Sequence, residues 1–272
     1  MKIHISMDIE GVAGVVLPAH GQPGNPEYER ARRLMTNEAN AAIAGAFDAG
    51  ATEVLVNDSH GPMVNLLPEL LDPRAQLILG KPKAGNMAAG LDGSFDGMFL
   101  VGHHSGAGQY GVLSHTINGF AFHAIRVNGI DCAEATLYGA YAGSMGVRVA
   151  LLTGDDQLMT QCAPLFPGVE QAVVKYALGH RAAWSFSPQT ACQIIHDAAM
   201  RAIQNLAAMQ PFTIAPPYRL EIDLTTVGIA DQAAIIPVAE RPGPRTVAFA
   251  AQTMDEVIGW VNTVSALSTA LR

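Results

Sequence analysis

Cationic residues are scarce in this 272-residue chain. Lysine and arginine together number 16 against 24 acidic residues, so the formal net charge is -8 and the pI is near 5.5. No run of basic residues occurs. Because nucleic acids and anionic membranes attract clustered positive charge, we expect neither as a partner. A small molecule or a short peptide is expected instead.

Long apolar runs and cysteine are scarce as well. No uninterrupted apolar span reaches about 18 residues, so we expect no transmembrane helix. The first residues, MKIHISMDIEG, contain acids and no long apolar stretch, which is not typical of a secretory signal. Cys132, Cys162 and Cys192 are widely spaced, which argues against a disulfide framework or a cysteine zinc site. We expect reduced, mostly buried thiols in a cytoplasmic protein.

The hydrophobic content is high enough for a large core. It reaches 49% with a mean hydropathy of +0.20, which excludes a disordered chain and allows one or two domains. Strand-like and helix-like patterns alternate, which predicts an α/β fold with a mostly parallel, doubly wound sheet. The expected strands are 2–8, 52–58, 75–80, 97–103, 148–156 and 172–176, and the expected helices are 27–49, 63–71, 134–145 and 187–208.

Two segments depart from this alternation. Residues 111–132, with an Asn128-Gly129 turn, predict an inserted antiparallel ribbon beside the main sheet. The strand-like LEIDLTT and TVAFAAQ and a helix opened by a capping box at 253–256 predict a smaller α+β lobe. We therefore predict a metal-binding catalytic domain over 1–210 and a C-terminal lobe over 211–272, either separate or integral to the same domain.

Acids and histidines gather where the expected strands end. Asp8 and Glu10 follow the first strand, His60 follows the second, and His103-His104 follow the strand 97–103. The carboxyl edge of an open α/β sheet is where ligands bind. Taken alone, each acid is more often a solvated turn residue and each histidine a hydrogen-bonded one. Their number and kind nevertheless indicate a metal site.

With Glu134 added, the set is rich in carboxylate and contains no cysteine, unlike a structural zinc site. It is too large for one tetrahedral zinc. Two metal ions are therefore expected, with Asp8 as a plausible bridge, and amide hydrolysis is the natural use of such a pair. His115, in Ser114-His115-Thr116, is either a catalytic base, acid or nucleophile or a hydrogen-bonded strand histidine.

A GxGxxG match at 106–111 raises the alternative of a dinucleotide-dependent oxidoreductase. The following VLSHTI is strand-like, so no helix N-terminus is expected to hold a pyrophosphate. These glycines are more consistent with a loop over the metal centre. Asp155 and Asp156 are expected to be acids at a helix N-terminus, or else supports for the metal ligands.

Five ordered motifs carry a family resemblance: MDIEG (7–11), LMTNEAN (34–40), EVLVNDSH (53–60), GVLSHT (111–116) and TGDD (153–156). Together they resemble the zinc-dependent D-aminopeptidases of the dipeptide-transport operon, the DppA type, over nearly the whole chain. The resemblance implies a binuclear zinc peptidase that removes D-amino acids from short peptides such as D-Ala-D-Ala, and a ring-shaped homodecamer.

Carried over by position, the resemblance implies two zinc ions per subunit, with other divalent metals as alternatives. The implied ligands are Asp8, Glu10, His60, His104 and Glu134, with Asp8 touching both metals, and His115 is the implied catalytic histidine. The glycine-rich stretch from His103 to Gly111 departs from the family pattern, which leaves substrate preference open. The competing hypothesis from another class is a non-catalytic, metal-stabilised peptide-binding or assembly protein.

Overall fold

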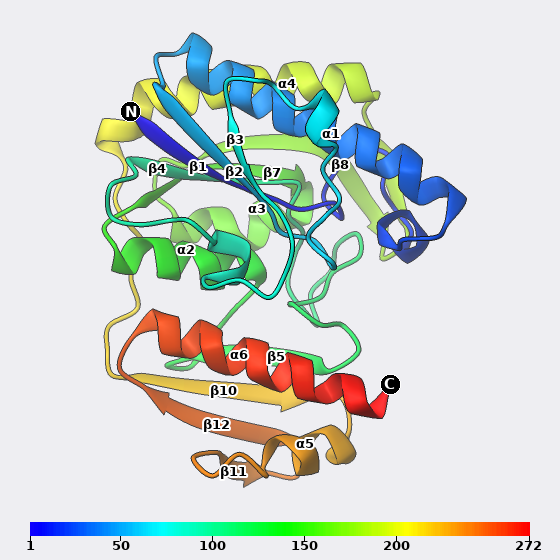
Figure 1. Ribbon diagram of the computed structural model, residues 1–272, viewed down its shortest axis with the longest axis vertical. Coiled ribbons are helices and arrows are strands. Elements are labelled where there is room, and N and C mark those ends of the chain that lie inside the picture. The colour runs from blue at the N-terminus through cyan, green and yellow to red at the C-terminus, as the bar shows by residue number, and fades with distance from the viewer.

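Two β-sheets organise the computed structural model, which describes residues 1–272 (Figure 1). The larger has seven strands in the order β3-β2-β1-β4-β7-β8-β9, and all its pairings are parallel except that of β8 with β9. The expected α/β fold with a mostly parallel sheet is confirmed. The strands are β1 (Lys2–Met7), β2 (Glu53–Asp58), β3 (Gln76–Ile78), β4 (Gly97–Val101), β7 (Arg148–Asp155), β8 (Glu170–Gly179) and β9 (Ala182–Ser185).

Helices cover both faces of this sheet (Figure 1). On one face, α1 (Pro26–Asp48) and α4 (Pro188–Asn205) pack side by side. Their buried residues share a hydrophobic cluster with β1 and β4. On the other face lie α2 (Glu134–Ser144) and a second cluster that continues into the smaller sheet. The central strands are therefore buried on both sides, which explains the nearly continuous apolar runs of β4 and β7.

The smaller sheet has five antiparallel strands in the order β11-β12-β10-β5-β6. These are β5 (Phe122–Val127), β6 (Ile130–Asp131), β10 (Tyr218–Leu224), β11 (Glu240–Gly243) and β12 (Thr246–Ala251). The hairpin β5-β6 is the expected ribbon, and β5 pairs with β10 of the C-terminal segment. The sheet thus draws strands from both sides of the expected boundary at 210/211, and the division into two domains stays a prediction.

Side-chain caps fix where the long helices begin. Asn25 caps α1, Ser187 caps α4 and Thr253 caps α6 (Met254–Ser268), each by accepting a hydrogen bond from a first-turn amide. The remaining helices are α3 (Asp156–Cys162) and α5 (Val227–Ala233), with 3-10 turns at Pro18–Gly21, Pro68–Leu70, Asn86–Ala88, Ala163–Leu165, Leu206–Ala208 and Thr269–Leu271. No helix has the length and apolar character needed to cross a membrane. The three cysteines are unpaired, as expected.

Two expected elements are wrong. The predicted helix over 63–71 is reduced to the 3-10 turn Pro68–Leu70. The amides of Asn65 and Leu66 bind the Asp58 carboxylate, and Met63 has a φ of 58°, which breaks a helix. The predicted strand over 111–117 is an irregular loop, because Leu113 and Ile117 have positive φ values of 54° and 61°. Extended backbone cannot contain such residues.

Candidate metal centre

The expected site residues lie at one edge of the larger sheet. β2, β1 and β4 are neighbours and run parallel, so their carboxyl ends meet there. Asp8 follows β1, His60 follows β2 and His104 follows β4. Glu134 is the first residue of α2 and points into the same place.

These side chains form two groups that share one residue. Asp8, Glu10 and His60 make the first, and Asp8, His104 and Glu134 the second; within each group the potential ligand atoms lie within 4.8 Å of one another. The His60 Nδ1 to Asp8 Oδ1 distance is 3.3 Å. His104 Nε2 lies 3.5 Å from both Asp8 Oδ2 and Glu134 Oε2. Ligand atoms around a tetrahedral zinc, with bonds of about 2.0–2.1 Å, are separated by about 3.3 Å.

Hydrogen bonds select the free nitrogen of each histidine. His60 Nε2 lies 2.9 Å from the Gly21 carbonyl oxygen, and His104 Nδ1 lies 3.0 Å from that of Ser105. A ring nitrogen facing a carbonyl carries the proton, so in the neutral rings the lone pairs of His60 Nδ1 and His104 Nε2 lie on the side of the carboxylates, where a cation would accept them. His104 Nε2 and Glu10 Oε2 are buried without a hydrogen-bond partner. Buried acceptors that face one another in this way fit a bound cation.

The charges of the site support the same reading. Burial opposes ionisation of Asp8, but hydrogen bonds from His104 and His60 hold its pKa well below the usual value. Burial also opposes the charged forms of His60 and His104, yet the neighbouring Glu10, Glu134 and Asp8 raise both pKa values well above 6.5. The buried carboxylates therefore demand positive charge. A bound divalent cation can supply it in place of imidazolium protons.

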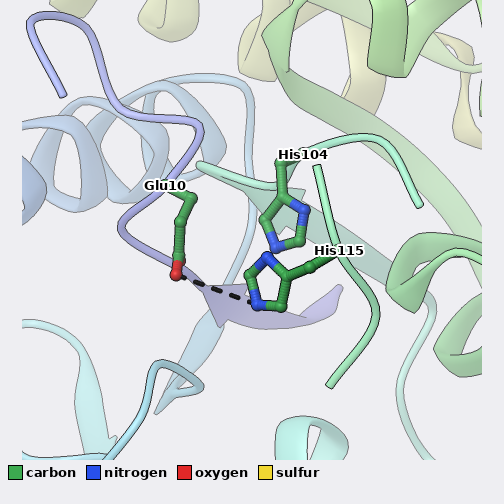
Figure 2. Close-up of side chains that lie close together, drawn as sticks. All are labelled: Glu10, His104 and His115. Carbon is green, nitrogen blue, oxygen red and sulfur yellow. Dashed lines mark ion pairs between the residues drawn. The ribbon is translucent and has the colours of Figure 1, made fainter. Parts of the chain in front are cut away.

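His115 forms a third group of potential ligands with Glu10 and His104 (Figure 2). Its ring stacks on that of His104 with centroids 4.2 Å apart and an interplanar angle of 10°. Its Nδ1 lies 2.8 Å from the Leu113 carbonyl oxygen, and its Nε2 lies 4.0 Å from Glu10 Oε1 and 3.8 Å from Glu134 Oε1. The Nε2 atom is therefore free for ligation or proton transfer. The Ile117 amide ties the loop to Glu134 through a bond of 2.6 Å.

A buried lysine holds the loop that carries Glu10. Lys175 of β8 is fully buried, and its ammonium donates to the carbonyls of Glu10, Val12 and Val15. Glu38 of α1 accepts a hydrogen bond of 2.8 Å from the Ala13 amide, and burial raises its pKa to about 7. Sequence reasoning did not assign these positions. A lysine within the apolar strand pattern AVVKY was the available signal.

A cavity of about 550 Å³ opens onto the centre. Its lining includes His115 and four of the candidate ligands, namely Asp8, Glu10, His60 and Glu134. A loop with Lys81, Lys83 and Asn86 and the last turns of α6, with Asn262 and Ser265, line it as well. In Figure 1, α6 lies between the smaller sheet and the rest of the chain. No local sequence pattern indicated that these two segments reach the site.

Other expected residues lie outside the two groups. His103 is buried behind them, with Nε2 3.3 Å from Ser6 Oγ. Asp155 caps α3 by accepting from the Leu158 amide, and Asp156 accepts from the Ala177 amide. The GxGxxG stretch at 106–111 is followed by the irregular loop and by no helix, so it lacks the amide cradle that a dinucleotide needs.

Comparisons with known proteins agree on one family. The family model described as D-aminopeptidase matches residues 1–263. A D-aminopeptidase of Bacillus subtilis (strain 168) is 38% identical over 259 residues, which cover 94% of this chain and 93% of that protein. A solved structure, the Zn-dependent D-aminopeptidase DppA from Bacillus subtilis, a self-compartmentalizing protease, superposes with a TM-score of 0.96 at 35% identity. It covers 99% of this chain and 98% of its own.

Proposed function

The chain belongs to the D-aminopeptidase family and is a metallo-aminopeptidase, and from this we propose that two zinc ions serve its reaction. In this proposal the enzyme removes N-terminal residues, D-amino acids in particular, from short peptides or amides. The observation that carries it is the pair of ligand groups that share Asp8. One zinc ion would leave part of this buried carboxylate set without compensating charge.

The proposed ligands divide between the two ions. Glu10 and His60 would hold one, His104 and Glu134 would hold the other, and Asp8 would contribute to both. The separations of 2.8–3.5 Å between potential ligand atoms and the orientation of both imidazoles support this division. When bound, such ions lower the pKa of a coordinated water and polarise the scissile carbonyl.

His115 is proposed to assist at the scissile carbonyl or the leaving amine. Its Nδ1 proton is directed at the Leu113 carbonyl, so Nε2 is the atom that accepts or donates a proton. This atom borders the cavity near Glu10 and Glu134. The stacking on His104 restricts the ring, which keeps Nε2 directed toward the substrate space.

The assembly is proposed by similarity. The Bacillus structure is described as self-compartmentalizing, and we propose that this chain likewise forms a homo-oligomer, a ring-shaped homodecamer, in the cytoplasm. Sedimentation velocity of the purified protein tests the stoichiometry. A monomer at micromolar concentration would reject the assembly without affecting the proposed chemistry.

The reaction is tested by hydrolysis of paired D- and L-aminoacyl amides and of D-Ala-D-Ala by zinc-loaded protein. Asp8→Asn and His60→Ala should abolish turnover. His115→Ala should lower kcat by about 10²–10⁴-fold while zinc content stays unchanged. The exposed His123 of β5 provides the control, since His123→Ala removes an imidazole that belongs to no ligand group. Undiminished activity of thoroughly metal-stripped protein would reject the proposal.

A further inference from the structure

Two lysines line the cavity that opens onto the acidic centre. The chain has four lysines, and Lys81 and Lys83 both line the same 550 Å³ space as Asp8 and Glu10. Of the four, only Lys2 makes an ion pair, with Glu53 on the surface. In a chain with a net charge of -8, unpaired cations at this place are a specific feature.

Lys83 is held in position but has hydrogen-bonding capacity left. Its half-buried ammonium donates to the Asp58 carbonyl oxygen at 2.7 Å, which uses one of three donors. Burial lowers the pKa of Lys83 to about 8, because Asp58 compensates only part of the lost hydration. The group is therefore a partly desolvated cation that lacks an anion.

The hydrogen bond to the Asp58 carbonyl also places the Lys83 ammonium close to the metal centre. Asp58 is the last residue of β2, and the proposed ligand His60 follows two positions later. Lys81 is exposed on the same loop. The next part of the loop is fixed to α6, since the Asn86 side-chain amide donates to Asn262. The loop thus presents positive charge from a supported position.

The lining of the cavity therefore combines the carboxylates of the centre with two lysine ammonium groups. A free peptide has the matching arrangement, with an amine at one end and a carboxylate at the other. We propose that Lys83, assisted by Lys81, binds the free C-terminal carboxylate of a short peptide whose N-terminal residue lies at the metal centre. This deepens the proposed function and rests on it for the position of the N-terminal residue. The cavity lies within the range of about 300–1,000 Å³ that holds single small ligands, so a dipeptide or tripeptide is the expected length.

The proposal predicts discrimination between acids and amides. A charge-assisted hydrogen bond corresponds to a change in kcat/KM of about 10- to 100-fold. Wild-type enzyme should therefore hydrolyse D-Ala-D-Ala faster than its C-terminal amide by about this factor. Lys83→Met should lower kcat/KM for the dipeptide to the level of its amide, with little effect on the amide itself. Lys81→Met should show a smaller loss of the same kind, and Lys2→Met serves as the matched surface control.

Turnover of the peptide amide distinguishes a loss of carboxylate recognition from a folding defect. A purely structural role of Lys83 at Asp58 would lower turnover of both substrates together, and that result would overturn the proposal. Equal turnover of acid and amide by the wild type would also overturn it. If wild-type protein hydrolyses neither, the proposed function fails, and calorimetric titration of the zinc-loaded protein with both compounds decides the carboxylate site. If wild-type protein binds the peptide acid more tightly than the amide and Lys83→Met abolishes this preference, the site is supported. Equal binding of the acid and the amide by wild type rejects it.

Discussion

Replacement of Lys175 by methionine tests whether one buried cation stabilises the loop that carries Glu10. The ammonium donates to three carbonyls, of which that of Val12 also accepts from the Val15 amide. The carbonyls of Glu10 and Val15 have no other donor. Each buried acceptor left unpartnered costs about 1–3 kcal/mol, so the pair costs about 2–6 kcal/mol.

Methionine has nearly the length of lysine, so little cavity is created. Relief of the ammonium's desolvation offsets part of the cost. We expect a net loss of about 3 kcal/mol in the free energy of unfolding, measured by urea denaturation of metal-free protein with the fluorescence of Trp184 and Trp260. We also expect weaker zinc binding, because Glu10 lies on the loosened loop.

The surface lysine gives the matched control. Lys2 pairs with Glu53 at 3.2 Å in an exposed position, so Lys2→Met should change the free energy of unfolding by about 0.5 kcal/mol or less. The reasoning would be refuted if the free energy of unfolding of Lys175→Met lay within about 1 kcal/mol of the wild-type value and the variant bound zinc equally well.

Three further predictions follow from the site and its supports. Despite burial, neighbouring carboxylates raise the pKa values of His60 and His104 above 6.5, so zinc must displace protons from both rings. The apparent affinity for zinc should therefore rise with pH above 6.5. Calorimetry in buffers of different ionisation enthalpy should detect the released protons. Burial raises the pKa of Glu38 from 4.5 to about 7, so its stabilising contribution is complete below pH 4.5 and lost as pH rises through 7. Denaturation should therefore show that the free energy of unfolding of Glu38→Gln, relative to that of wild type, is higher at pH 8 than at pH 5 by up to about 3 kcal/mol. The same difference between variant and wild type at both pH values would contradict this. A Cβ at Gly102 would lie 2.2 Å from the Asp8 carbonyl oxygen, whereas at Gly108, with a similar φ of 75°, it meets nothing; zinc content should fall in Gly102→Ala and persist in Gly108→Ala.

The parallel sheet and the gathering of ligands at its edge could be predicted because both depend on local pattern. Apolar runs such as residues 97–101 and 149–152 identify central strands without any knowledge of their partners. Once those strands are parallel, residues at their carboxyl ends meet. Asp8, His60 and His104 were therefore within reach of sequence reasoning, although they are about 50 positions apart.

Features set by distant contacts could not be predicted. The helix expected over 63–71 is lost because the Asp58 carboxylate binds the amides of Asn65 and Leu66, which is a tertiary interaction. The pairing of β5 with β10 joins segments about 95 residues apart, and no local signal specifies it. The same holds for α6, which brings Asn262 to the cavity. Long-range packing thus determines the substrate side of the site.

The most direct test of the account is the zinc content per subunit of wild-type protein and of Asp8→Asn, measured by mass spectrometry of metals after dialysis. The shared position of Asp8 predicts two zinc ions per wild-type subunit and loss of both in the variant, because each ligand group then lacks a carboxylate. His60→Ala, which alters one group only, should retain one. A single zinc ion in the wild type, or two in Asp8→Asn, would contradict the central claim.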